Sequence, residues 1–158
     1  MLRILQMKNG RINIIILTIL IIATIAFIWS NSLQSIPESQ ERSLGMMVKI
    51  TPVLEVFVGK GNVTDHLVRK LAHFIEFGAL GCELVLLLAL HCRLRVQTVV
   101  NCLFVCLTVA VTDETIQIFS NRGSQVQDVL LDFAGACTGI AFVLAVYWLV
   151  RIVRKKHD

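Results

Sequence analysis

The chain has 158 residues, of which 56% are hydrophobic, and its formal net charge is +4 at pH 7. Soluble domains are about 45–50% apolar. Here the excess is gathered in long blocks, which excludes an ordinary soluble domain and predicts a single membrane domain over residues 1–158. The positive charge does not indicate nucleic-acid binding, because the basic residues cluster beside the apolar blocks as membrane anchors. They are not interleaved with aromatic residues as on a nucleic-acid surface.

The first apolar block covers residues 12–29 and follows three basic residues, Arg3, Lys8 and Arg11. As a helix, this block is long enough to cross about 30 Å of hydrocarbon. A cleaved signal peptide has a shorter apolar core and a cleavage site of small residues. We therefore expect an uncleaved membrane anchor.

A polar connector follows over residues 30–69. Its first part, residues 30–35, has the composition of a loop. Apolar residues then recur at helical spacing, namely Leu44, Met47, Val48, Val53, Leu54, Phe57 and Val58. This spacing predicts either an amphipathic helix in the membrane interface or a loosely packed lid, which Gly59 and Gly61 end.

The remaining apolar blocks predict three more spans, at residues 70–90, 96–117 and 126–150. The second and third spans form an antiparallel hairpin, because only residues 91–95 connect them. Ser124, with Gln127 three residues later, has the form of a capping box at the start of the fourth span. The expected fold is an all-α membrane protein, a four-transmembrane-helix bundle.

Four spans place both termini on one side of the membrane, and the basic residues indicate which side. The termini and the second connector carry Arg3, Lys8, Arg11, Arg93, Arg95, Arg151, Arg154, Lys155 and Lys156. The opposite side carries fewer basic residues, and many acids offset them. We therefore expect both termini in the cytoplasm. Arg69 and Lys70 oppose this rule at the edge of a span, which invites a functional explanation.

Polar side chains share one helix face at the outer end of both the second and the third span. They are Lys70, His73 and Glu76 in the second span and Asp113, Glu114 and Gln117 in the third. Ionisable groups near hydrocarbon are costly and seldom persist without a partner or a function. Each also has a plain structural reading, since lysine can extend to the interface and acids are common near helix starts.

The fourth span carries a stripe of Asp128, Asp132, Gly135 and Gly139 at helical spacing. The pair of glycines permits close approach to a neighbouring helix. That contact would carry the two acids into the same cavity as Lys70. We therefore expect the charged ends of three spans to line one polar pocket on the outer side.

The acids of this pocket outnumber its cations, and crowded carboxylates cannot all stay ionised in a low dielectric. Three resolutions remain open: some acids are protonated, water reaches the site, or a divalent cation such as Mg²⁺ or Ca²⁺ binds among the oxygens. The spacing matches no specific metal motif, so the sequence assigns no metal ligands and leaves the cofactor open.

Further polar groups and thiols lie deeper in the apolar blocks. Glu83 and Asn101 are placed for an interhelical hydrogen bond. Cys102 and Cys106 are one helical turn apart and could hold a soft metal, but packing as small hydrophobic side chains is the expected role.

Several of these residues form a pattern that extends over residues 27–142. It comprises Lys70-x-x-His73-Phe74-x-Glu76-Phe77, Asp113-Glu114-x-x-Gln117-x-Phe119, Arg122, Asp128-Val129, Gly135-x-x-x-Gly139, Phe27-x-x-Ser30-x-Ser32 and Ser43. The pattern resembles that of VanZ-like membrane proteins. Two positions depart from it: Phe77 stands where tyrosine is usual, which removes a hydroxyl, and Asp132 stands where asparagine is usual, which adds a negative charge.

The resemblance implies a multi-pass protein of the bacterial cytoplasmic membrane. The family's namesake is associated with low-level resistance to the glycopeptide teicoplanin. The resemblance supplies no reaction.

We expect the pocket to bind an anionic or glycosylated envelope lipid, or a lipophilic glycopeptide. Lys70, His73 and Arg122 would contact phosphate or carboxylate oxygens. The other predicted ligand-binding residues would orient these cations and accept hydrogen bonds from sugar hydroxyls: Glu76, Asp113, Glu114, Gln117, Asp128 and Asp132.

The alternative is a membrane-embedded, metal-assisted hydrolase or transferase that acts on a lipid-linked substrate. His73 or Glu76 would then be the acid–base residue, while Asp113 and Glu114 would hold a metal or a water molecule. A purely structural subunit is a third reading. The sequence does not predict the oligomeric state.

Overall fold

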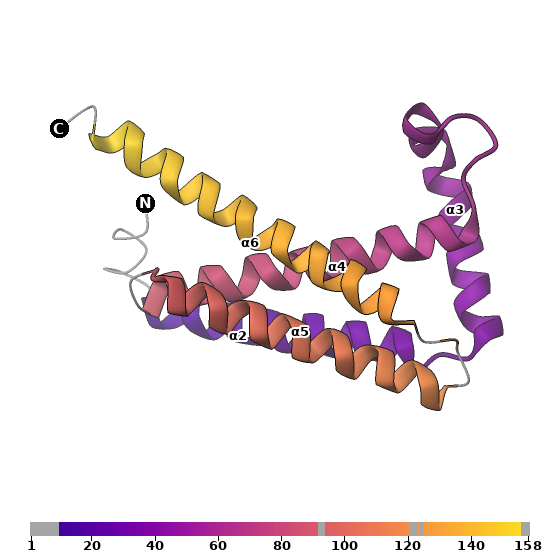
Figure 1. Ribbon diagram of the computed structural model, residues 1–158, viewed down its shortest axis with the longest axis horizontal. Coiled ribbons are helices and arrows are strands. Elements are labelled where there is room, and N and C mark those ends of the chain that lie inside the picture. The colour runs from indigo at the N-terminus through magenta and orange to yellow at the C-terminus, as the bar shows by residue number, and fades with distance from the viewer. Residues whose placement is uncertain (1–9, 92–93, 121–122, 124, 156–158) are drawn as a thin grey trace.

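A computed structural model of the chain describes residues 10–91, 94–120, 123 and 125–155, which form five α-helices (Figure 1). In chain order they are α2 (Gly10–Ser32), α3 (Ile36–Val58), α4 (Asp65–His91), α5 (Val96–Phe119) and α6 (Val126–Lys155). Within these ranges, four helices are long and apolar enough to cross a membrane, namely α2, α4, α5 and α6. The predicted all-α fold with four spans is confirmed.

The four spans pack side by side, and successive spans run in opposite directions (Figure 1). The start of α2, the end of α4, the start of α5 and the end of α6 therefore lie at one end of the bundle. The end of α2, the start of α4, the end of α5 and the start of α6 lie at the other end. This second end gathers the polar segments of all four spans.

The contact between α4 and α6 is the most extensive one between two of these helices. A Cβ atom at Gly139 would overlap the backbone oxygen of Gly78, and one at Gly135 would overlap that of Phe74. The two glycines therefore set the separation of the helices, as the sequence predicted. Their close approach brings the acidic first turns of α6 beside α4.

Apolar side chains from all four spans form the core of the bundle. Its buried members include Ile28, Phe77, Leu80, Val85, Ala110 and Ala136. Cys102 and Cys106 are buried in the same core, as expected for small hydrophobic side chains. By contrast, α2 exposes a row of isoleucines, a surface suited to lipid tails: Ile12, Ile15, Ile19 and Ile22.

The prediction of a loop over residues 30–35 is wrong in its first half, because α2 continues to Ser32. Asn31 donates a hydrogen bond of 3.3 Å to Glu76 Oε1, and Ser32 donates one of 2.6 Å to Asp113 Oδ1. Serine and asparagine favour loops when their side chains bond to nearby backbone. Here the side chains of Asn31 and Ser32 bond instead to carboxylates of α4 and α5. Helix α2 therefore continues as far as these carboxylates.

The start of α3 is a capping motif that the sequence prediction did not use. The backbone N–H and the hydroxyl of Ser35 both donate to Glu38 Oε2, at 3.1 and 2.9 Å. These bonds, the hydroxyl one first, lower the pKa of Glu38. Pro37 stands in the first turn, where a helix needs no N–H donor. The helix ends at Gly59, whose φ of 87° favours glycine, as predicted.

Helix α3 lies across the second end of the bundle and contacts α4 (Figure 1). Ser43 of α3 donates a hydrogen bond to Oδ1 of Asp65, the first residue of α4. Large apolar side chains stay exposed along α3, among them Val48, Val53, Val56 and Phe57. The helix therefore presents apolar surface next to the start of α4.

The predicted hydrogen bond between Glu83 and Asn101 is wrong. Thr24 of α2 donates to Glu83 Oε1 at 3.0 Å, whereas Asn101 is exposed and accepts a bond of 2.9 Å from Gln97. Glu83 therefore pairs with α2 rather than with α5. The spacing of residues along α4 identified the face that carries Glu83, but it did not identify the helix that packs against this face.

Candidate functional site

The charged ends of α4, α5 and α6 surround a cavity of about 280 Å³. Its lining residues are Gln40, His66, Arg69, Lys70, His73, Glu114, Gln117, Gly123, Gln125, Asp128, Leu131 and Asp132. A larger hollow of about 700 Å³ lies along α3, but all of its lining residues fall within residues 34–49. Because no span contributes to that hollow, it is the surface of one chain segment, and the smaller cavity is the candidate site.

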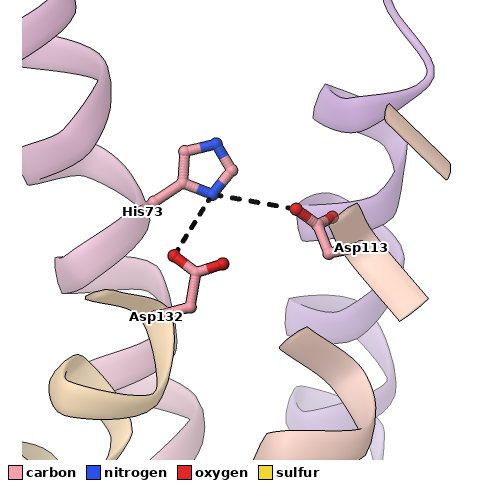
Figure 2. A group of neighbouring side chains, drawn as sticks. All are labelled: His73, Asp113 and Asp132. Atoms are coloured by element: carbon pink, nitrogen blue, oxygen red, sulfur yellow. Dashed lines mark ion pairs between the residues drawn. The ribbon is translucent and has the colours of Figure 1, made fainter. Parts of the chain in front are cut away.

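His73, which lines the cavity, lies between the carboxylates of Asp113 and Asp132 (Figure 2). Its Nδ1 atom is 3.8 Å from Asp113 Oδ2 and 3.7 Å from Asp132 Oδ1. The side chains of Asp113 and Asp132 are 0% and 1% exposed. The three residues come from three different spans, so helix packing alone brings them together.

Asp113 is held in place by donors on both sides. Ser32 donates to its Oδ1 at 2.6 Å, and Gln117 donates to its Oδ2 at 3.0 Å. The same Gln117 amide also donates to Glu114 Oε1 at 3.0 Å, and the backbone N–H of Gln125 donates to Glu114 Oε2 at 3.3 Å. The two neighbouring acids of α5 are thus fixed by four hydrogen bonds from α2, α5 and the segment before α6.

The cations of the site lie nearer to the solvent. Lys70 Nζ is 3.1 Å from Asp128 Oδ1, and both side chains are partly exposed. Arg69 Nε is 3.2 Å from Asp65 Oδ2 on the same helix. Partly exposed ion pairs contribute only about 0–1 kcal/mol each. These pairs therefore leave the two cations available to an anion that enters the cavity.

Not every predicted site residue lines the cavity. Glu76 points toward α2, where its Oε1 accepts the bond from Asn31. Arg122, predicted as a phosphate contact, and Ser124, predicted as a cap, lie outside the described residues. In the described part, the first turn of α6 is closed by the bond of 2.9 Å from Asp128 N to the Gln125 carbonyl oxygen.

Some residues at the site were missed by the sequence prediction. Asn31 and Ser32 were assigned to a loop, and Gln40, His66 and Gln125 were not considered. His66 could have been found, because it precedes Lys70 by one helical turn on the same face. It was left out because the span was predicted to begin at residue 70, whereas α4 begins at Asp65.

A comparison with protein families matches the chain to VanZ/LLP1 over residues 14–151. This match confirms the resemblance that the motifs predicted. No curated protein and no solved structure matches the chain.

Proposed function

The chain belongs to the VanZ/LLP1 family, and on this premise we propose that the cavity between α4, α5 and α6 binds the polar head of an anionic or glycosylated envelope lipid. One observation carries the proposal: side chains of both charge signs from three spans line a single space of about 280 Å³. Ionisable groups at span ends are costly unless they serve a partner. A lipid head with phosphate oxygens and sugar hydroxyls suits such a lining.

The cations suit the phosphate. Lys70 and Arg69 line the cavity together with the imidazole of His66. Ionised donors such as the first two side chains form the stronger hydrogen bonds to phosphate oxygens. Lys70 is partly exposed beside Asp128, so a phosphate can join the pair without the desolvation of a fully buried charge. Arg122, in the segment outside the described residues, remains part of the proposed phosphate contact.

The acceptors suit sugar hydroxyls. Glu114, Asp128 and Asp132 line the cavity with carboxylate oxygens, and Gln117 adds an amide. A hydroxyl of a sugar can donate to any of these oxygens. Glu76 lies outside this lining and serves by holding Asn31 and the end of α2 in place.

The size of the cavity favours a lipid head over a whole glycopeptide. Cavities for drug-sized ligands are about 300–1,000 Å³, and this one is about 280 Å³. A contribution to teicoplanin resistance would therefore act through the lipid head bound here, or through only part of the glycopeptide.

The proposed orientation places both termini in the cytoplasm of a bacterium and the cavity on the outer side of its cytoplasmic membrane. Arg11, Arg95, Arg151 and Arg154 belong to the end of the bundle that holds the start of α2 and the end of α6, and basic residues favour the cytoplasmic side. In this orientation the exposed apolar side chains of α3 rest in the outer membrane interface.

A hydrolase or transferase acting on a lipid-linked substrate is the second candidate, and the surroundings of His73 favour it. An imidazole beside a buried carboxylate is an arrangement found in general bases. The distances of 3.7 and 3.8 Å would have to shorten when substrate binds. Replacing His73 with glutamine separates the two candidates, since a binding site would lose part of its affinity whereas a general base would lose its reaction.

Native mass spectrometry of the protein extracted from bacterial membranes tests the proposal. The wild type should retain one phosphate- or sugar-bearing lipid. Lys70→Ala should reduce retention about 10–100-fold, because a hydrogen bond to a charged group contributes about 1.5–3 kcal/mol.

Lys60→Ala is the matched control, because Lys60 is exposed in the segment between α3 and α4 and does not line the cavity. This control should retain the lipid as the wild type does. Equal retention by the Lys70 and Lys60 variants, or a wild type without any such lipid, would contradict the proposal.

A further inference from the structure

We propose that His73, Asp113 and Asp132 bind one divalent transition-metal ion, Zn²⁺ or Mn²⁺, between α4, α5 and α6. One potential ligand atom of each residue lies within 4.8 Å of the other two. Nδ1 of His73 is 3.8 Å from Asp113 Oδ2 and 3.7 Å from Asp132 Oδ1 (Figure 2). These distances are too long for hydrogen bonds. They approach the separation of about 3.4 Å between two ligands of one tetrahedral ion with bonds of about 2.1 Å.

The burial of the carboxylates is an independent reason for an ion. The side chain of Asp132 is 1% exposed, and its Oδ2 atom has no hydrogen-bond partner among the described residues. The carboxyl groups of Asp113 and Glu114 are buried as well. A buried carboxylate with an unpartnered oxygen is strongly unfavourable. A dication at the centre of the three residues would give the Asp132 carboxylate a partner of opposite charge.

The surroundings of Asp113 fit a metal ligand. Ser32 and Gln117 donate to its two oxygens, which is how outer groups commonly orient a coordinating carboxylate. One imidazole nitrogen with two carboxylate oxygens suits Zn²⁺ or Mn²⁺, whereas Mg²⁺ and Ca²⁺ prefer oxygen ligands alone. No spacing motif in the sequence identifies this set, because each residue comes from a different helix.

The ion would face the cavity. His73 and Asp132 line the cavity and Asp113 lies behind them, so the remaining coordination positions open toward a bound molecule. A phosphate oxygen could occupy one of these positions. This binding of phosphate to the ion rests on the proposed function, whereas the metal site itself is independent of that function.

Metal analysis of the purified protein tests the site. After dialysis against micromolar Zn²⁺ or Mn²⁺, the wild type should hold one ion per chain, measured by mass spectrometry of the metal and of the intact protein. Asp132→Asn, which keeps the size of the side chain, and His73→Gln should each lose this ion. Ser32→Ala removes an outer donor and should weaken binding about 10–100-fold.

Glu83→Gln is the matched control. Glu83 lies on α4 and is also buried, but its carboxyl group accepts a hydrogen bond from Thr24 of α2 and does not belong to the three residues. This variant should hold the ion as the wild type does. A wild type that takes up neither ion, or an Asp132→Asn protein that binds as tightly as the wild type, would overturn the metal site. Lipid retention measured on the same samples keeps the two proposals separate, because a metal-free wild type that still retains lipid through Lys70 refutes only the metal site.

Discussion

The hydroxyl of Ser32 donates a hydrogen bond of 2.6 Å to Asp113 Oδ1, although the two residues are 81 positions apart in the chain. Both side chains are fully buried. The bond joins the last residue of α2 to the acidic end of α5, at the level where α4 and α6 bring their own polar side chains. The first span is therefore part of the site as well as a membrane anchor.

Ser32→Ala should lower the free energy of unfolding by about 1–3 kcal/mol, because it leaves a buried carboxylate oxygen without its donor. Thermal unfolding in a fixed detergent measures the change. Ser30→Ala is the control, since the exposed Ser30 hydroxyl donates to the Phe27 carbonyl oxygen within its own helix. Equal stability of the two variants would show that the bond to Asp113 contributes nothing.

Gly139→Ala should destabilise the bundle by about 3 kcal/mol, because the added methyl group overlaps the backbone oxygen of Gly78. Neither backbone can move aside without separating α4 from α6. Gly45→Ala, on α3, meets nothing within 4 Å and should leave the stability unchanged or slightly higher. Unfolding in detergent compares the two, and a Gly139 variant as stable as the wild type would contradict the close helix contact.

Thr24→Val should cost about 0.6 kcal/mol and at most about 1.7 kcal/mol, the average and the maximum for hydrogen bonds between spans, because Glu83 loses its donor on α2. Asn101→Ala should change the stability by less than about 0.5 kcal/mol, since Asn101 is exposed. The same unfolding measurement decides between them. A larger effect at Asn101 would restore the pairing expected from the sequence.

A protease site inserted after Gly61 tests the orientation. This position lies between α3 and α4, at the end of the bundle that holds the cavity. Protease added to intact cells should cut there, whereas a site added after the last residue should be cut only when the cells are opened. The reverse pattern would place the cavity on the cytoplasmic side.

The spans were predictable because length and continuous apolarity identify them without any knowledge of their neighbours. The close contact made by α6 was predictable for a similar reason. Gly135 and Gly139 indicate that another helix packs closely there, whichever helix it is. The start of α3 was also predictable, because Ser35, Pro37 and Glu38 form a known helix-start pattern. The prediction placed Ser35 at the end of a loop and assigned no helix start there.

The partners across the bundle were not predictable. The sequence around Ser32 is typical of a loop. Ser32 is helical because its hydroxyl donates to the Asp113 carboxylate on another span. Glu83 shows a polar face, but only the packing of the helices selects Thr24 over Asn101. The group of His73, Asp113 and Asp132 has no sequence spacing, because three helices each supply one member.

Photo-crosslinking from inside the cavity tests the central claim most directly. A photoreactive amino acid in place of Leu131, which lines the cavity, should capture a lipid with a phosphate or sugar head, and Lys70→Ala should reduce the product about 10–100-fold. The same amino acid in place of its exposed neighbour Leu130 should capture bulk membrane lipids whether or not Lys70 is present. If position 131 captures no lipid, or the same mixture of lipids as position 130, the cavity does not hold a lipid head.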